Sequence, residues 1–165
     1  MKIIRTVHDM HSYADSVRSR GATIALVPTM GYLHEGHLSL MRLAKTKADT
    51  LVVRVFVNPR QFGPGEDFED YPRDWGRDSE LLVSVGTDCA FVPDVDQMYP
   101  EGYQTSVAVR DITENLCGRT RPSHFEGVAT VVAKLFNCTK PHCAVFGQKD
   151  FQQLMVIRRM VTDLN

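Results

Sequence analysis

Long apolar runs, blocks of like charge and paired cysteines are all missing from this sequence. No apolar run approaches the roughly 20 residues that a membrane-spanning helix needs, so no membrane partner is expected. Lysine and arginine are scattered and the formal net charge is −1, which leaves no basic patch of the kind that binds nucleic acid. We therefore expect neither tRNA nor DNA as a partner.

The cysteines and the amino-terminal segment point to a reducing compartment. No C-x-x-C pair occurs, and a polar helical pattern, rather than the apolar core of a secretory signal, follows the first residues. We expect free thiols and a cytoplasmic protein. At 165 residues, 43% of them hydrophobic, the chain can form one domain with a sizeable core. The four cysteines are Cys89, Cys117, Cys138 and Cys143.

Helical and strand-like patterns alternate along the chain, without repeats or linkers. This alternation predicts right-handed crossovers and an α/β fold with a Rossmann-like, doubly wound, mostly parallel sheet. A polar loop is expected over 58–71. Helices are predicted through 10–17 with a stop at Gly21, and over 38–47, 74–85, 123–138 and 150–163. Strands are predicted over 23–27, 51–57, 89–92, 105–109 and 143–146.

A histidine pair follows the 23–27 strand. His34 and His37 flank Gly36 at the expected start of the next helix. A strand, a glycine-containing turn and a helix present free backbone N–H groups at the positive end of the helix dipole, where phosphate binds well. Both imidazoles could then donate hydrogen bonds to a reacting phosphorus centre.

Two plainer interpretations of the pair stay open. Histidines at a helix start are often surface residues or caps. A zinc site is less favoured, because H-E-x-x-H zinc histidines lie four apart on one helical face, whereas these lie three apart across a glycine. No metal-ligating residue is predicted.

Three loops should meet at the carboxyl edge of the sheet, because ligands of such folds bind there, near the topological switch point. They are 28–37, 58–62 and 147–153. Lys149 offers a charge for phosphate, and Asp150 could cap a helix or accept from a ribose hydroxyl. Gln61 and Gln153 can donate and accept, which suits a small polyhydroxylated acid.

Together these segments resemble the pantothenate synthetase family, the ATP-dependent ligases of pantoate and β-alanine. The resemblance rests on P-T-M-G at 28–31 with L-H-E-G-H at 33–37, F-V-N-P-R-Q-F at 56–62, Y-P-R at 71–73, R-P-S-H-F at 121–125, G-V-A-T-V-V-A-K-L-F at 127–136 and G-Q-K-D-F-Q-Q-L at 147–154. Gln148, Glu126 and Arg60 depart from the family pattern, which more usually has Glu, Arg and an apolar residue there.

The resemblance implies a two-step reaction. Pantoate attacks the α-phosphorus of ATP to give pantoyl adenylate and pyrophosphate, and β-alanine then displaces AMP. It implies catalytic roles for His37, as proton donor, His34 and Lys149, and pantoate binding by Gln61 and Gln153, with Gln61 also near β-alanine. Asn58, Arg121 and His124 would be wall residues or structural ones. The implied ATP-binding residues are Met30, Gly31, Tyr32, Leu33, His34, Glu35, Gly36, His37, Gly147, Gln148, Lys149 and Asp150.

The resemblance also implies Mg²⁺, held mainly by phosphate oxygens and water, and a homodimer. Family members continue into a smaller C-terminal domain whose mobile loop closes over the triphosphate. On this basis the whole chain, 1–165, is expected to be the N-terminal domain, able to fold but impaired in catalysis.

Two alternatives compete with this interpretation. One is another H-x-G-H nucleotidyltransferase that makes a cofactor such as a dinucleotide; its phosphorylated acceptor should meet more Arg or Lys than these loops offer, where Gln61 and Gln153 stand. The other is a non-catalytic binding or dimerisation domain, favoured if ATP binds without pyrophosphate exchange.

Overall fold

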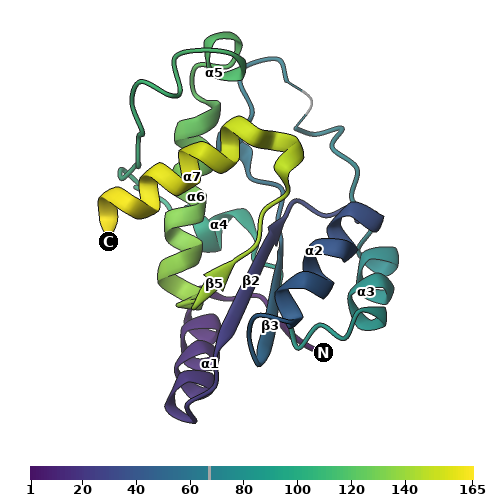
Figure 1. The fold of residues 1–165 in the computed structure, drawn as a ribbon. Helices are drawn as coiled ribbons and strands as arrows, with labels where there is room; N and C mark the ends of the chain where they lie inside the picture. The colour runs from purple at the N-terminus through teal and green to yellow at the C-terminus, as the bar shows by residue number, and fades with distance from the viewer. Residues whose placement is uncertain (67) are drawn as a thin grey trace.

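The computed structural model describes residues 1–66 and 68–165 and contains one parallel sheet with helices on both faces (Figure 1). Its strand order is β1-β4-β3-β2-β5, and every neighbouring pair is parallel. The predicted fold class is confirmed. Asp67, within the loop expected over 58–71, lies outside the described residues.

The elements follow one another in βα order. The strands are β1 (Lys2–Ile4), β2 (Ile24–Thr29), β3 (Thr50–Val55), β4 (Cys89–Phe91) and β5 (Cys143–Ala144). The helices are α1 (Val7–Ser19), α2 (Glu35–Lys45), α3 (Trp75–Ser84), α4 (Val95–Met98), α5 (Cys117–Thr120), α6 (His124–Thr139) and α7 (Phe151–Leu164), and the 3-10 turns are η1 (Pro59–Gln61) and η2 (Gln148–Asp150).

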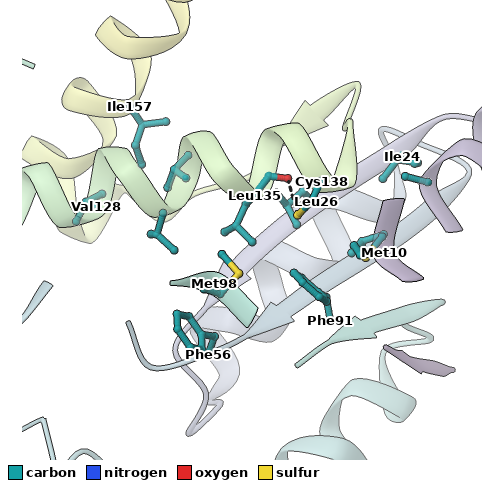
Figure 2. Packing of buried hydrophobic residues seen from close by; sticks show 14 of the residues in the cluster. Met10, Ile24, Leu26, Phe56, Phe91, Met98, Val128, Leu135, Cys138 and Ile157 are labelled. Carbon is teal, nitrogen blue, oxygen red and sulfur yellow. Dashed lines mark hydrogen bonds between the residues drawn. The ribbon is translucent and has the colours of Figure 1, made fainter. Parts of the chain in front are cut away.

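Alternate side chains of the strands supply two cores. On β2, Ala25 and Val27 join the cluster with α2 and α3, whereas Ile24 and Leu26 join the cluster with α1, α6 and α7. Figure 2 shows the second cluster, in which side chains of α6 lie against those of the sheet. Each fully buried aliphatic side chain contributes about 1.5–3 kcal/mol, so these two layers hold the sheet in place.

One predicted strand is wrong. The segment 105–109 forms no strand; Val107 donates its backbone N–H to the Thr130 hydroxyl of α6 at 2.9 Å, and Val107 and Val109 pack against the core. The alternation therefore reflects packing onto a helix rather than sheet pairing. The short elements β1, α4, α5, η1 and η2 were not predicted, since they have too few residues to show a period.

The strand order places two predicted loops side by side. The chain steps from β2 to β3 to β4 in one direction, and β5 then pairs with the other side of β2. The order thus reverses between β2 and β5, and the turns that follow both strands meet at the carboxyl edge. Among the described residues, no helix has the length and apolar character to cross a membrane.

Candidate functional site

A buried carboxylate on α3 binds the backbone of the turn that follows β2. Gly31 and Tyr32 have positive φ angles of 89° and 49°. Asp78 of α3, 1% exposed, accepts the backbone N–H groups of Tyr32 at 2.8 Å and Leu33 at 2.7 Å. Thr29 accepts the Gly31 N–H at 3.2 Å. The strained turn is therefore fixed by α3 and by the end of β2.

Most backbone N–H groups of the turn are already bound within the protein, whereas the sequence led us to expect free ones. Besides those bound to Asp78 and Thr29, the His34 N–H reaches His37 Nδ1, the Gly36 N–H reaches His34 Nδ1, and the His37 N–H reaches the His34 carbonyl. That expectation is wrong for most of the turn, because Asp78, Thr29 and the two histidines accept these N–H groups. An anion here must be held mainly by side chains, assisted by the helix dipole.

The two histidines form a capping box at the start of α2. His34 Nδ1 accepts from Gly36 N–H at 3.1 Å, and His37 Nδ1 accepts from His34 N–H at 3.4 Å. A ring nitrogen that accepts carries no proton, so each neutral imidazole has its proton on Nε2. The ring centroids are 4.1 Å apart. The pair thus presents two neighbouring Nε2–H donors.

Gly36 makes this arrangement possible. An added Cβ would lie 2.8 Å from His34 Cε1 and 3.0 Å from His34 Nδ1, closer than atoms tolerate. Any side chain would therefore displace the His34 ring from its capping position. The H-x-G-H spacing is in this respect a structural requirement of the cap.

Charges from the β5 turn reach the histidine pair. The pKa of half-buried His37 is lowered, first by burial and then by the neighbouring His34, with a smaller contribution from Lys149. The charges of Asp78 and Asp150 oppose this shift. Asp150 also raises the pKa of His124, which burial lowers. The β5 turn therefore lies within electrostatic range of both the β2 turn and the start of α6.

Lys149 is free to reach an anion. Its side chain is 95% exposed and lies 3.9 Å from the Asp150 carboxylate, a loose contact. Gly147 sits against α2, because a Cβ there would lie 3.7 Å from the Leu40 side chain. Gln148 is exposed at the same turn. The β5 turn thus brings one exposed cation to the end of the sheet where α2 begins.

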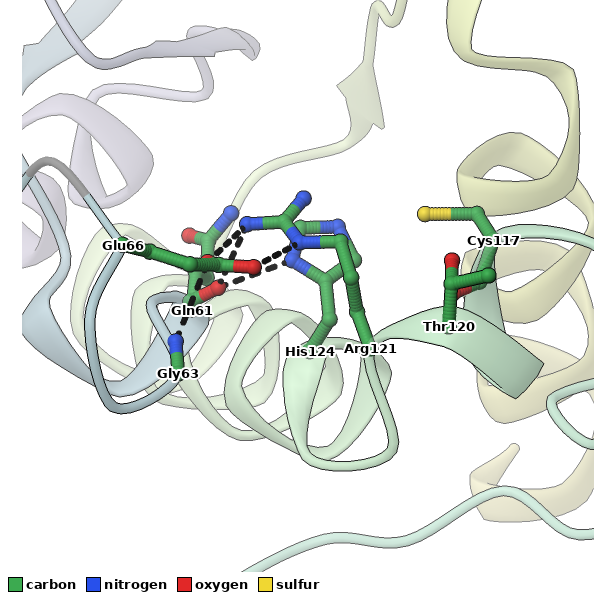
Figure 3. Close-up of polar contacts among 7 residues, drawn as sticks. All are labelled: Gln61, Gly63, Glu66, Cys117, Thr120, Arg121 and His124. Atoms are coloured by element: carbon green, nitrogen blue, oxygen red, sulfur yellow. Dashed lines mark hydrogen bonds and ion pairs between the residues drawn. The ribbon is translucent and has the colours of Figure 1, made fainter.

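The second loop is fixed through the backbone of Gln61 (Figure 3). Its carbonyl meets Arg121 Nη2 at 3.1 Å and His124 Nδ1 at 2.9 Å. Arg121 also binds Glu66 through two N–H groups at 2.7 and 2.6 Å. This pairing lowers the pKa of Glu66 to about 2. Arg121 and His124 therefore hold the loop in place.

Asn58 is a structural residue of the same loop. It is 0% exposed, donates to the Gln61 Oε1 at 2.9 Å and to the Gly127 carbonyl at 3.1 Å, and accepts from the Tyr99 hydroxyl at 2.8 Å. A Cβ on Gly127 would lie 2.0 Å from the Arg60 carbonyl, so α6 and η1 approach through a glycine.

Gln153 lies half-buried in the first turn of α7. Among the described residues no hydrogen bond joins it to Gln61, so the two glutamines share no direct polar contact. Its neighbour Gln152 is engaged instead, donating to the Ile112 and Asn115 carbonyls at 2.9 and 2.7 Å. The side chain of Gln153 is thus left available to a ligand.

A cavity of about 270 Å³ opens beside the β2 turn. Met30 and Gly31 line it, with residues from the ends of β3 and β4. A larger groove of about 890 Å³ lies between α6, β5 and α7 and contains none of the predicted site residues. We place the candidate site at the carboxyl edge because the predicted polar groups gather there.

The described residues, 1–66 and 68–165, bring no three metal-ligating side chains together. Asp78, the buried acid of the turn, already accepts two backbone N–H groups. These residues therefore form no metal cage of their own.

Three residues that hold this site in place were not predicted from the sequence: Asp78, Glu66 and Tyr99. Asp78 falls on an amphipathic helix, and its partners lie 45 and 46 residues away along the chain. No local spacing signals such a contact. Of the departures from the family pattern, Glu126 is exposed, and Arg60 lies against the rings of Tyr99 and Tyr103 at 5.5 and 5.3 Å.

Comparison with known proteins decides the family. A model of the pantoate-beta-alanine ligase family matches residues 2–165. The chain belongs to that family. It is 61% identical to the pantothenate synthetase of Geobacter sulfurreducens and 59% identical to that of Syntrophus aciditrophicus. Each match covers 100% of this chain and 58% of the relative, so the chain spans little more than half the length of these family members.

Solved structures of this ligase family have the same fold. Pantothenate synthetase from Thermus thermophilus superposes with a TM-score of 0.93 at 48% identity, covering 99% of this chain and 58% of the other. Pantoate-beta-alanine ligase from Francisella tularensis, complexed with beta-gamma ATP and beta-alanine, gives 0.93 at 39% identity, covering 99% and 63%.

Proposed function

We propose that this chain binds ATP and pantoate in one cleft and forms pantoyl adenylate, the first half of pantothenate synthesis. The pantoate carboxylate attacks the α-phosphorus of ATP and pyrophosphate leaves; the amine of β-alanine then attacks the acyl carbon and releases AMP. Membership of the ligase family supports this, as does the Francisella relative, which is complexed with beta-gamma ATP and beta-alanine.

One observation carries the proposal: both histidines turn Nδ1 to the backbone and leave an Nε2–H free. Two fixed donors at a helix start suit the phosphate oxygens, on which negative charge grows as pyrophosphate departs. The lowered pKa of His37 keeps its ring neutral near pH 7, so the ring donates without changing charge. His37 would supply the hydrogen bond to the departing phosphate, and His34 would assist it.

The other polar groups divide between the two substrates. Residues 30–37 and 147–150 would surround the nucleotide, with exposed Lys149 swinging onto the phosphates. Gln61 and Gln153 would hold pantoate, and Gln61 would also lie near β-alanine. The Gln61 side-chain oxygen is taken by Asn58, which leaves its NH₂ group for an oxygen of the substrate.

Mg²⁺ would accompany ATP and neutralise part of the triphosphate charge. Because the described residues offer no cage for it, phosphate oxygens and water would hold the ion. The protein's own contribution to charge neutralisation is then Lys149 and the dipole of α2.

We expect residues 1–165, tested by themselves, to catalyse the reaction slowly. About two fifths of each relative lies outside the matched region, and a lid supplied by that part would exclude water from the triphosphate. A homodimer through this domain is also expected.

Exchange of labelled pyrophosphate into ATP tests the proposal. We expect exchange that requires pantoate, at a rate below that of the full Geobacter sulfurreducens relative. Exchange at the relative's rate would show the remaining sequence to be dispensable. Exchange that is independent of pantoate would overturn the proposed substrate.

A further inference from the structure

Tyr99, which closes the carboxyl end of α4, joins a hydrogen-bond chain that ends at Gln61. Its hydroxyl donates to Asn58 Oδ1 at 2.8 Å, and Asn58 Nδ2 donates to Gln61 Oε1 at 2.9 Å. Asn58 is 0% exposed and Gln61 is 8% exposed. Buried amides of this kind need every partner they have, since an unpaired buried polar group is costly.

The donors and acceptors in this series of hydrogen bonds can be assigned in only one way. The Gly127 carbonyl can only accept, so the Asn58 group that faces it at 3.1 Å must be the NH₂. The Asn58 oxygen then faces Tyr99, which must donate. The second hydrogen of the same NH₂ group fixes the oxygen of Gln61 toward Asn58, which turns the Gln61 NH₂ group to the other side.

The surroundings of Tyr99 keep its hydroxyl protonated and its ring in place. Burial raises the pKa of the phenol to about 12, against the opposing charges of Arg54 and Arg60. The ring lies under the Arg60 guanidinium at 5.5 Å and the Lys134 ammonium at 5.7 Å. Tyr103 packs edge-on against the same ring at 5.1 Å. The phenol therefore remains a donor across the physiological pH range.

We propose that Tyr99 is a positioning residue, whose hydroxyl orients the Asn58 amide and through it the Gln61 amide. This rests on the proposed function, in which Gln61 binds pantoate. It follows that Gln61 presents its NH₂ group to the ligand, since its oxygen is turned toward Asn58. The substrate group at Gln61 is then an oxygen that accepts, a carboxylate or hydroxyl oxygen of pantoate, and not the ammonium group of β-alanine.

Tyr99→Phe tests the positioning role directly. Tyr103→Phe is a matched control, because Tyr103 packs against the same ring but takes no part in the hydrogen bonds from Tyr99 to Gln61. Calorimetric titration of each variant with pantoate and, separately, with ATP gives the readout. Loss of the hydroxyl leaves Asn58 Oδ1 unpaired, so we expect Tyr99→Phe to weaken pantoate binding about tenfold and to leave ATP binding unchanged. Tyr103→Phe should match the parent chain for both ligands.

A second set of variants tests the direction of the Gln61 amide even if Tyr99→Phe fails to fold. Gln61→Glu replaces the outward NH₂ with an oxygen, so it should bind pantoate more weakly than Gln61→Ala does. Arg119→Gln makes the same change of net charge at an exposed position outside this hydrogen-bond network and should have the smaller effect. Equal binding by Gln61→Glu and Gln61→Ala would overturn the proposed orientation.

The remaining outcomes are also decisive. A folded Tyr99→Phe chain that binds pantoate as tightly as the parent, or that loses ATP and pantoate affinity equally, would overturn the positioning role. A parent chain that binds no pantoate would instead refute the proposed function itself, and that titration precedes the others.

Discussion

His34 and His37 each use one ring nitrogen to cap α2, and no hydrogen bond within the described residues occupies the other. The sequence alone could not separate a cap from a phosphate-binding residue, and the structure shows that the two roles are compatible. The cap fixes which nitrogen carries the proton, so the local folding requirement sets the chemistry that the pair can offer.

Substitution of His37 separates the two roles. Glu at this position can still accept the His34 N–H, as in an ordinary capping box, but cannot donate to phosphate. We expect His37→Glu to keep the thermal stability of the parent and to lose pyrophosphate exchange by about 100-fold or more. His37→Ala should lose both the exchange and about 1 kcal/mol of stability. Equal exchange by His37→Glu and the parent would contradict the donor role.

Gln153 and Gln152 form a matched pair of neighbours. If Gln153 binds pantoate, Gln153→Ala should weaken pantoate binding by about 1–3 kcal/mol and leave ATP affinity intact. Gln152→Ala removes hydrogen bonds to the 112–117 segment and should instead lower stability without a selective loss of pantoate. Isothermal titration with each ligand distinguishes the two; equal losses for both ligands in Gln153→Ala would indicate a structural role.

Residues with local signals were predictable, and residues that act through distant partners were not. The histidine pair and Lys149 follow strands that can be seen in the apolar pattern. Asp78 and Tyr99 act on loops 41 to 46 residues away, and nothing in their own neighbourhood marks them. The expectation of free turn N–H groups failed for the same reason, because Asp78 lies on another element.

At the scale of elements, the approach of α6 to η1 depends on Gly127. A methyl group there would overlap the Arg60 carbonyl at 2.0 Å, and backbone cannot move aside as a flexible side chain can. We expect Gly127→Ala to lower the free energy of unfolding by about 3 kcal/mol, the upper end for overpacking. Gly76→Ala in α3 is the control, and it should raise stability by about 0.5–1 kcal/mol. Urea denaturation of both variants measures this, and a neutral Gly127→Ala would contradict the close packing.

The ion pair between Glu66 and Arg121 ties the η1 loop to the segment before α6. Its hydrogen bonds lower the pKa of Glu66 from 4.5 to about 2. A carboxylate with a lowered pKa stabilises the fold above its unfolded pKa, and this stabilisation is lost as pH falls toward the folded value. The stability difference between the parent and Glu66→Gln should therefore shrink between pH 4.5 and about 2. Urea midpoints that fall in parallel across this range would contradict the assignment.

Regular elements were predictable because their apolar periods are long. The helix expected over 38–47 begins at Glu35 instead, since the histidine cap extends it by a turn. Apolar and polar residues alternate over 105–109 as in a strand, but the segment packs on α6. The alternation arises because one side of the segment is buried, and within the part of the chain that the structure describes the segment has no partner in the sheet.

At the scale of the whole molecule, the strand order makes the site. Because β5 pairs with the opposite side of β2 from β3, the turns after β2 and β5 meet, and segments more than a hundred residues apart share one edge. The order of strands in the sheet was not specified by the apolar pattern. The Rossmann-like fold class could be predicted, because strands and helices alternate along the sequence.

The melting temperature of the parent chain with each ligand tests the central claim most directly, that one cleft binds both ATP and pantoate. A ligand that binds only the folded state raises the melting temperature by mass action, and the rise grows with ligand concentration. We predict that ATP and pantoate each raise it, and that the two together raise it more than either alone. Failure of both ligands to shift the transition at millimolar concentration would contradict the account.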